Sequence, residues 1–203
     1  MDSKCNPGGR HHSCGHERGR GHGPSSFWMH DPKLIFKQTG LKKGDSFLDL
    51  GCGTGDYALY AAAIVGEDGA VYAVDIWQEL ITNLITAADK QGLDNLIGIS
   101  ADITAPLPLK DRCIDVCFIA TVIHTLDKDK AIGPLLAEIR RVLKPGGKLV
   151  VIECKKQDMP FGPPKHIRFT AEETESLVIP CGFKKTGFTD LGYNYLIQFR
   201  LRG

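Results

Sequence analysis

Short apolar segments typical of β-strands alternate with longer segments typical of α-helices along most of the chain. The expected strands cover residues 46–50, 70–75, 95–100, 113–120 and 148–153. In such an order the helices are crossovers that connect parallel strands and pack on both faces of the sheet. The alternation therefore predicts an α/β fold with a doubly wound, mostly parallel sheet.

Residue types at the segment ends mark where helices begin and end. Asp31 is expected to cap a helix that ends at Gly40, and Thr170 forms a capping box with Glu173. Further helices are expected over 56–66, 77–92, 129–147 and 170–182. The helix of 129–147 is expected to end at Pro145 and the two glycines that follow it.

The last part of the chain follows a different pattern. Residues 183–192 and 193–201 are two strand-like segments that follow each other directly. They are expected to pair as adjacent antiparallel strands. The mostly parallel sheet should therefore carry an antiparallel C-terminal hairpin.

Length and charge limit the class of protein. The chain has 203 residues, 42% of them hydrophobic, and a formal net charge of +1. Residues 27–203 suffice for one domain with a sizeable core, whereas residues 1–26 lack hydrophobic periodicity and are expected to form a flexible arm. The near-neutral charge indicates no nucleic-acid or membrane surface. No apolar run is long enough to span a bilayer.

Cysteine usage and the first residues bear on the compartment. The chain has seven cysteines, an odd number without the paired spacing of a small secreted fold. The first residues are polar and glycine-rich, unlike a secretory signal. We therefore expect reduced thiols and a cytoplasmic location.

A glycine-rich turn, LDLGCGTGD, follows the first predicted strand. Gly51, Gly53 and Gly55 let the backbone turn tightly and approach a ligand, and ligands of doubly wound sheets bind at the carboxyl ends of the strands. Asp56 stands where a dinucleotide-binding turn has its third glycine, and its carboxylate would repel a diphosphate. No lysine follows the glycines, so the turn is not a P-loop either.

Acidic residues at the ends of three predicted strands indicate the kind of ligand. Asp49 suits a cationic group, and Asp75 could accept hydrogen bonds from both hydroxyls of a ribose. Asp102 could accept a hydrogen bond from an adenine amino group, with Ile76 and Ile103 on either side of the ring. Together they describe a nucleoside that carries an amine or a sulfonium and no phosphate.

Four successive motifs resemble those of the class I S-adenosylmethionine-dependent methyltransferases. They read FLDLGCGTGDYALY, VYAVDI, ADI and RRVLKPGGKLVVIE, and the similarity extends over roughly residues 30–200. The resemblance implies a Rossmann-like, seven-stranded sheet and S-adenosylmethionine as the cofactor. It implies cofactor contacts at Asp49, Gly51, Gly53, Gly55, Asp75, Ile76, Asp102, Ile103 and Thr121. Asp49 would act on the methionine amine, directly or through water, and the backbone of Thr121 would hold the methionine moiety.

The acceptor is expected to be a small molecule. After the fourth strand the chain reads ATVIHT, which resembles the branch of ubiquinone and menaquinone methyltransferases. The Asn-Pro-Pro-Tyr-like motif of enzymes that methylate amino groups of nucleic acids and glutamine is missing there. His124 is the candidate catalytic base, or else it packs beneath the cofactor. In the expected substrate lid, His166 and Arg168 either line a pocket, where Arg168 would suit an anionic acceptor, or are solvated.

Other functions stay open as alternatives. Arsenite methyltransferases share this domain and hold the metalloid with thiolates, and the expected domain contains Cys52, Cys113, Cys117, Cys154 and Cys181. Their placement does not follow that family, and a free cysteine is often only a small core residue. A metalloid or thiol methyltransferase is therefore an alternative, as is a cofactor-binding or metal-sensing protein without broad catalytic activity.

The N-terminal arm contains a further candidate site. Cys5, His11 or His12, Cys14 and His16 could supply thiolate and imidazole ligands for zinc. Their spacing matches no standard finger, and the glycines between them make a preformed site costly in entropy. The arm is therefore expected to bind metal weakly, and no metal site is expected in the domain. Nothing in the residues indicates an oligomeric state.

Overall fold

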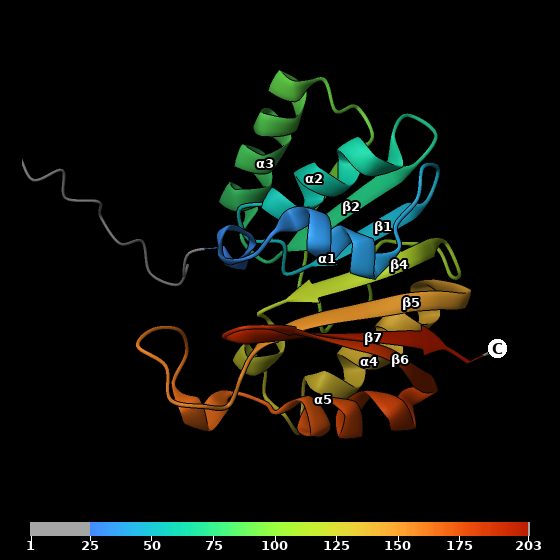
Figure 1. The fold of residues 1–203 in the computed structure, drawn as a ribbon. Helices are drawn as coiled ribbons and strands as arrows, with labels where there is room; N and C mark the ends of the chain where they lie inside the picture. Colours follow the sequence, from blue (N-terminus) through green and yellow to red (C-terminus); the bar gives the residue numbers. More distant parts are fainter. Residues whose placement is uncertain (1–24, 203) are drawn as a thin grey trace, which may run out of the picture.

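Seven strands form one mixed sheet in the order β3-β2-β1-β4-β5-β7-β6 (Figure 1), which confirms the predicted fold class. The computed structural model describes residues 25–202. The strands are β1 (Ser46–Leu50), β2 (Ala70–Asp75), β3 (Leu96–Ser100), β4 (Ile114–Ala120), β5 (Leu143–Cys154), β6 (Phe183–Leu191) and β7 (Asn194–Leu201). Strands β1 to β5 are parallel, whereas β7 is antiparallel to both β5 and β6.

Helices cover both faces of the sheet. Figure 1 shows α1 (Pro32–Thr39), α2 (Asp56–Val65) and α3 (Gln78–Gln91) on one face and α4 (Ile132–Val142) and α5 (Ala171–Val178) on the other. Within residues 25–202 there are also four short 3-10 helices: η1 (Ser26–Met29), η2 (Ile123–Thr125), η3 (Lys165–Ile167) and η4 (Ile179–Cys181). The predicted Asp31 cap of α1 and the capping box of α5 are confirmed.

The sheet separates two hydrophobic cores. In β1, Leu48 and Leu50 point into the core beneath α4 and α5, whereas Phe47 points into the core beneath α1, α2 and α3. Burial on both faces explains why the parallel strands read as nearly continuous apolar runs. The sheet therefore forms a rigid base for the loops at its carboxyl edge.

The boundary between α4 and β5 differs from the prediction. Helix α4 ends at Val142, and β5 begins at Leu143, which is extended and pairs with Ile114. The residue before a proline favours extended backbone, so the chain leaves the helix before Pro145. Gly146 has a φ of 73° and lies where the β4–β5 register shifts. The two glycines therefore belong to an irregularity in β5 and are not a helix stop.

The strand order reverses between β1 and β4. From β1 the chain continues to β2 and β3 on one side, and from β4 it continues to β5 on the other. Loops that leave the two central strands diverge there, and such a point is where doubly wound sheets bind ligands. Figure 1 shows η1 and the segment around residue 160 at this same end of the sheet.

Two expectations fall partly or wholly outside the described residues. The described part of the chain includes only Ser25 and Ser26 of the proposed arm, 1–26, and the candidate zinc ligands lie outside the described residues.

Among the described residues, no helix has the length and apolar character needed to cross a membrane.

Candidate active site

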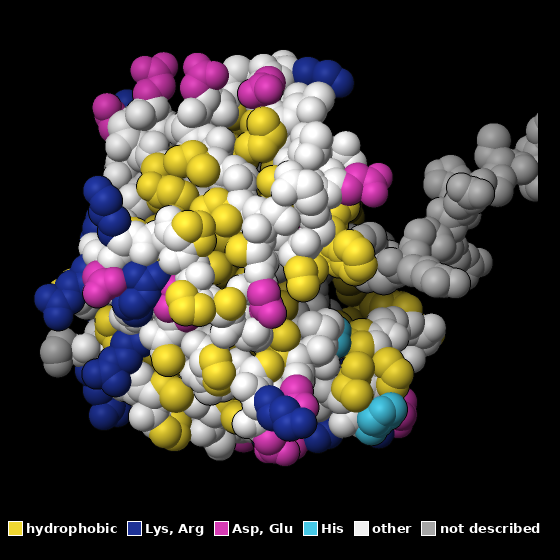
Figure 2. Space-filling model, turned by 180° about the vertical axis from the view of Figure 1, so that it is seen from behind, with side chains coloured by type: hydrophobic (Ala, Val, Ile, Leu, Met, Phe, Trp, Pro, Cys, Tyr) yellow, Lys and Arg dark blue, Asp and Glu magenta, His cyan; other side chains and the backbone are white. Residues whose placement is uncertain are grey.

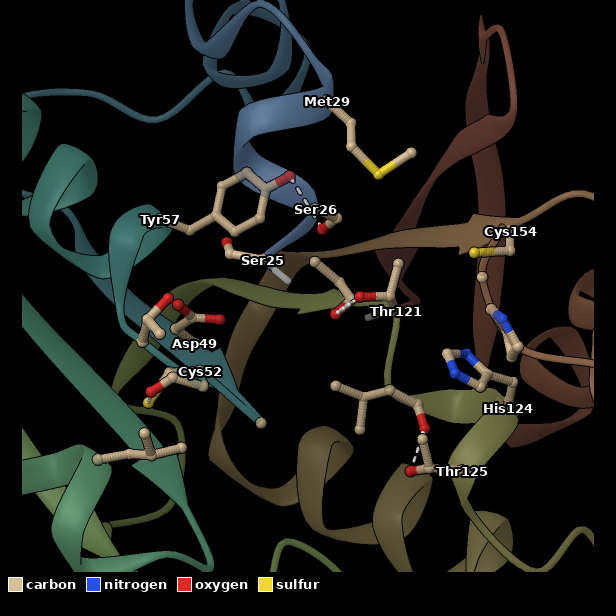
Figure 3. A pocket seen from close by; sticks show the side chains of 18 of the residues that line it. Ser25, Ser26, Met29, Asp49, Cys52, Tyr57, Thr121, His124, Thr125 and Cys154 are labelled. Atoms are coloured by element: carbon tan, nitrogen blue, oxygen red, sulfur yellow. Dashed lines mark hydrogen bonds between the residues drawn. The ribbon is translucent and has the colours of Figure 1, made fainter. Parts of the chain in front are cut away.

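A cavity of about 820 Å³ opens at the carboxyl ends of β1 and β4. Its walls come from the turn after β1, from η1 and η2, from the end of β5 and from residues 161–163. Figure 2 shows a recess near the right-hand margin with hydrophobic side chains on both sides of it. Inside, Asp49 and Cys52 lie on one side, and His124 and Cys154 lie on the other (Figure 3).

The glycine turn after β1 forms part of the wall, and Gly51 and Gly53 line the cavity. Gly51, Gly53 and Gly55 have φ values of 71°, 55° and 79°, which disfavour residues with a Cβ atom. A Cβ on Gly51 would meet Val122, and one on Gly55 would meet Leu84. A Cβ on Gly53 would meet no atom within 4 Å, so this position borders free space in the cavity.

Asp49 places a buried carboxylate at the cavity. The residue is 2% exposed, and within the described part of the chain its Oδ2 atom has no hydrogen-bond partner. Burial, reinforced by the nearby charges of Asp75 and Asp56, raises the pKa of Asp49 to about 8. A buried carboxylate without a partner is costly. A cationic ligand would provide the partner that Asp49 lacks among the described residues.

Asp75 ties the end of β2 to the glycine turn. Its Oδ2 accepts a hydrogen bond from the Gly53 amide at 2.9 Å, and its Oδ1 accepts one from the Trp77 amide at 3.1 Å. The carboxylate is buried, and it fixes the conformation of the turn next to Asp49. Asp75 itself is not among the residues that line the cavity.

The residues expected around an adenine ring differ in their burial. Ile76 is exposed at the surface, whereas Ile103 is buried in the core beneath α4. Asp102 is exposed and accepts hydrogen bonds from the amide and hydroxyl of Thr104, which lower the pKa of Asp102. None of the three lines the cavity, and neither does Gly55.

Thr121 lies at the wall, directly after β4. Its φ is 57° although it is not a glycine, and such strain persists only where neighbouring contacts impose it. The Thr121 amide donates to the Ile152 carbonyl at 2.8 Å, and its hydroxyl donates to the Ala120 carbonyl at 2.7 Å. The turn so formed leads the chain into η2.

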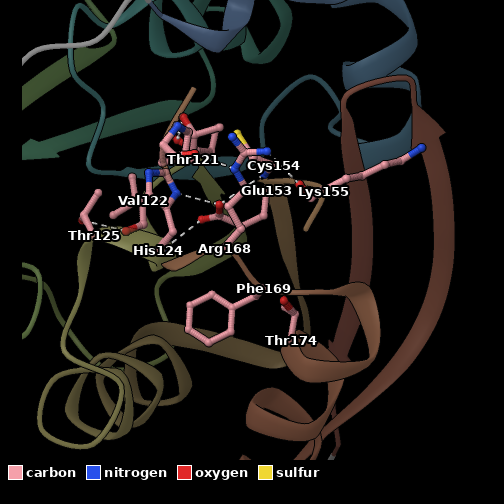
Figure 4. A network of polar contacts seen from close by, with 12 residues as sticks. Thr121, Val122, His124, Thr125, Glu153, Cys154, Lys155, Arg168, Phe169 and Thr174 are labelled. Atoms are coloured by element: carbon pink, nitrogen blue, oxygen red, sulfur yellow. Dashed lines mark hydrogen bonds and ion pairs between the residues drawn. The ribbon is translucent and has the colours of Figure 1, made fainter. Parts of the chain in front are cut away.

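His124 points into the cavity from η2 and is paired with Glu153, the penultimate residue of β5. The His124 Nδ1 atom lies 2.8 Å from the Glu153 Oε2 atom, and the Glu153 carboxylate is fully buried (Figure 4). The sequence pattern predicts only that Glu153 ends a strand. The signal for it was an acidic residue near the end of an apolar strand, as in β1 and β2.

Arg168 is not available to an anionic acceptor. It is 4% exposed, and its guanidinium donates to main-chain carbonyls of the segment before it. The acceptors are the carbonyls of Pro163 at 2.6 Å, Gln157 at 2.9 Å, Phe161 at 3.2 Å and Lys155 at 3.3 Å. Arg168 does not line the cavity, and His166 is an exposed loop residue. The expectation that Arg168 suits an anionic acceptor is therefore wrong.

The thiols at the cavity are not activated. Cys52 and Cys154 line it, but burial raises the pKa of both, to about 11 for Cys154, where the Glu153 charge adds to the effect. Thiolates are the species that bind metals and soft metalloids. Among residues 25–202 there is also no group of three or more His, Cys, Asp or Glu side chains arranged to hold a metal ion.

Known proteins share this architecture. Residues 41–191 match the family described as methyltransferase domain. The ubiquinone/menaquinone biosynthesis C-methyltransferase UbiE of Francisella tularensis subsp. holarctica is 35% identical over 140 residues, which are 67% of this chain and 54% of that protein. The demethylmenaquinone methyltransferase of Symbiobacterium thermophilum is 34% identical over 142 residues, 70% of this chain and 53% of that protein.

A solved structure is similar over nearly its whole length. The crystal structure of a SAM-dependent methyltransferase from Aquifex aeolicus superposes with a TM-score of 0.80 at 30% identity, covering 88% of this chain and 94% of that one. The matched part spans about half the length of the curated relatives. Because the family match covers most of the described residues, the chain belongs to the methyltransferase domain family.

Proposed function

We propose that the protein transfers a methyl group from S-adenosylmethionine to a small-molecule acceptor. The observation that carries this proposal is Asp49, a buried carboxylate without a hydrogen-bond partner in the described residues, beside a glycine turn. S-adenosylmethionine carries a sulfonium and an amine, and either cation would stabilise that carboxylate. The Aquifex protein, named as SAM-dependent, has the same fold.

The cofactor contacts predicted from the sequence form part of this proposal. Gly53 leaves space beside Asp49, and the backbone of Gly51 and Thr121 borders the same cavity. We assign the methionine end of the cofactor to this group. Asp75 would take the ribose hydroxyls with the lone pairs that its two backbone bonds leave free.

The adenine is assigned to the neighbouring strand ends. Asp102 and Ile103 follow β3, and Ile76 follows β2, which pairs with β3. Gly55 supports this arrangement from the start of α2, where it packs against Leu84.

When bound, the cofactor supplies a methyl carbon on a sulfonium, and the carbon–sulfur electrons leave with sulfur as the acceptor's electron pair forms the new bond. The protein has to align the acceptor with that carbon and exclude water. Met29, Phe161 and Pro163 give the cavity apolar walls. His124 is the proposed catalytic base, because it is the only imidazole among the described residues that line the cavity.

The acceptor is proposed to be uncharged and largely apolar. Among the described lining residues Asp49 is the only Asp or Glu, and none is Lys or Arg. The relatives named for ubiquinone and menaquinone support an organic acceptor. Metalloid methylation is not favoured, because the cavity thiols have raised pKa values. The five cysteines among residues 25–202 are all free thiols, which supports a reducing compartment such as the cytoplasm.

Two measurements test the proposal. Calorimetry with S-adenosylmethionine should give micromolar binding that Asp75→Ala weakens by at least about tenfold, or roughly 1.4 kcal/mol. Release of S-adenosylhomocysteine should then be measured with a panel of phenols, quinols, thiols, amines and arsenite. Absence of binding heat would overturn the cofactor assignment. Binding without turnover on the whole panel would favour a cofactor-binding role instead.

A further inference from the structure

Glu153 holds His124 at two points. The Glu153 Oε2 atom lies 2.8 Å from the ring Nδ1 atom, and Oε1 accepts a hydrogen bond from the His124 backbone amide at 3.4 Å. The carboxylate is fully buried and lies in β5, where Glu153 pairs with Tyr195 of β7. Pairing of Glu153 with β7, and of the preceding residue Ile152 with β4, holds the backbone of Glu153 in place, so the ring of His124 has a fixed orientation.

The pairing decides which ring nitrogen carries the proton. An ionised carboxylate only accepts hydrogen bonds, so the Nδ1 atom of His124 must be the donor. The lone pair of a neutral ring then lies on Nε2. In the described residues Nε2 has no protein partner, while the His124 side chain lines the cavity. The free lone pair is thus available to a molecule in the cavity.

Arg168 supplies a buried positive charge close to this pair. Figure 4 shows His124, Glu153, Cys154 and Arg168 in one network. The Glu153 charge raises the pKa of the Cys154 thiol and the Arg168 charge lowers it. Both charges therefore lie close enough to Cys154 to affect it. An isolated buried carboxylate would be costly, and the contacts of Glu153 with His124 and with the Cys154 amide offset part of that cost.

We propose that Glu153 is the positioning residue that keeps His124 in its Nδ1–H tautomer, so that Nε2 takes a proton from the acceptor. This inference rests on the proposed function. The Nε2 lone pair bonds to the acceptor's proton, and the electron pair of the broken bond stays on the acceptor atom, which becomes the nucleophile. Glu153 then stabilises the imidazolium that forms. The acceptor class is therefore a molecule whose oxygen, sulfur or activated carbon must lose a proton.

Nitrogen NMR tests the tautomer without any acceptor. In the histidine-labelled protein at a pH where the ring is neutral, long-range proton–nitrogen correlations should show His124 as the Nδ1–H form. Its signals are identified by their loss in His124→Gln. In Glu153→Met, which has no acceptor atom of comparable strength, the population should shift to the Nε2–H form that free imidazole prefers. Glu138→Gln, a change at a second buried glutamate, which lies in α4 and pairs with Arg141 instead of a histidine, should leave the tautomer unchanged.

A second readout uses acceptors that differ in their need for a base. With one phenol that is ionised at the assay pH and one of matched size that is neutral, Glu153→Gln should lose at least about tenfold in kcat on the neutral phenol and much less on the ionised one. Affinity for S-adenosylmethionine should stay within about twofold.

The inference and the proposed function fail separately. An Nε2–H tautomer in the unmodified protein, or an unchanged tautomer in Glu153→Met, would overturn the role of Glu153. If Glu153→Met does not fold, the role of Glu153 is still tested by the tautomer of the unmodified protein and by the comparison of the two phenols. Absence of turnover with both phenols counts against the proposed acceptor class, whereas the tautomer is read from the protein alone.

Discussion

Gly51 and Val122 pack so closely that a Cβ atom on Gly51 would lie 2.5 Å from the Val122 Cγ2 atom. Gly51 belongs to the turn after β1, and Val122 follows β4. The contact thus joins the two loops that diverge at the reversal of strand order. A glycine is needed there for two reasons: its φ of 71° and the lack of room for a side chain.

Replacing Gly51 by alanine should affect both stability and ligand binding. We expect Gly51→Ala to lower the free energy of unfolding by roughly 2–4 kcal/mol, because left-handed strain and overpacking add. Affinity for S-adenosylmethionine should fall by at least about tenfold, or roughly 1.4 kcal/mol. Urea unfolding and calorimetry measure the two effects.

Gly92 and Gly53 separate the effect of backbone strain from the effect on the cavity wall. Gly92 has a φ of 66° and no atom within 4 Å of an added Cβ, so Gly92→Ala should cost only strain, roughly 1–2 kcal/mol, without any change in affinity. Gly53→Ala should cost the same strain but lower affinity, since its methyl group would enter the cavity. Equal affinities for Gly51→Ala and Gly92→Ala would contradict this account of the wall.

The buried carboxylate of Asp49 should make stability depend on pH. Its pKa, about 8, is higher in the folded protein than in the unfolded chain. The folded state therefore binds more protons between about pH 4 and pH 8, and the contribution of Asp49 to stability falls as the pH rises through this range. Between pH 5 and pH 8, the free energy of unfolding of Asp49→Asn should exceed that of the unmodified protein by roughly 1–3 kcal/mol.

The check is a series of urea unfolding curves at several pH values. Asp94→Asn, a change at an exposed carboxylate, should follow the unmodified protein throughout. Binding of S-adenosylmethionine should become tighter as the pH approaches 8 and should release a proton below it, measured by calorimetry in two buffers of different ionisation enthalpy. A pH-independent difference between Asp49→Asn and the unmodified protein would rule out the titration of Asp49.

Phe27 should anchor η1 over the cavity, whereas its neighbour Trp28 should not. The Phe27 ring is buried and packs edge-on against Tyr57 at a centroid distance of 5.1 Å, while Trp28 is 76% exposed. Phe27→Ala should cost roughly 2–4 kcal/mol and weaken cofactor binding, because Ser26 and Met29 of η1 line the cavity. Trp28→Ala, the matched control, should change stability by less than about 0.5 kcal/mol.

Arg168 should hold the segment 155–163 in place. Its guanidinium donates hydrogen bonds to four main-chain carbonyls. A lysine ammonium cannot reproduce this planar, forked arrangement of donors. We expect Arg168→Lys to lower stability by roughly 1.5–3 kcal/mol and to speed amide hydrogen exchange in residues 155–163. Lys165→Met, which removes an exposed ion pair with Asp158, should cost less than about 1 kcal/mol. Equal exchange in both variants would show that the segment is held by other contacts.

The fold was predictable because its pattern is local. Strand and helix segments alternate, and caps such as Asp31 and Gly40 act within a few residues of themselves. The start of β5 was not predictable in this way, because Leu143 is extended through pairing with Ile114, a partner distant in sequence. Pro145 and the glycines after it match a helix stop in the local sequence, because the pairing of β5 with β4 is not a local feature.

Three candidate site residues lie at one cavity because they end or follow neighbouring strands. Asp49, Thr121 and His124 all line it, while their roles stay part of the proposed function. The role of Glu153 was not predictable, because it depends on a contact with His124. The two residues are distant in sequence, so no local pattern shows this contact. The role of Arg168 was not predictable, because its partners are main-chain carbonyls, which every residue type carries.

Strand β7 has a consequence for the order in which the site is completed during synthesis. It is the last strand of the described chain, yet it lies between β5 and β6. A domain emerging from the ribosome N-terminus first therefore has β1, β4 and the glycine turn available early, while Glu153 gains its neighbour Tyr195 only afterwards. A nascent chain of this protein would possess the loops proposed to hold the cofactor before Glu153 is in place to hold His124.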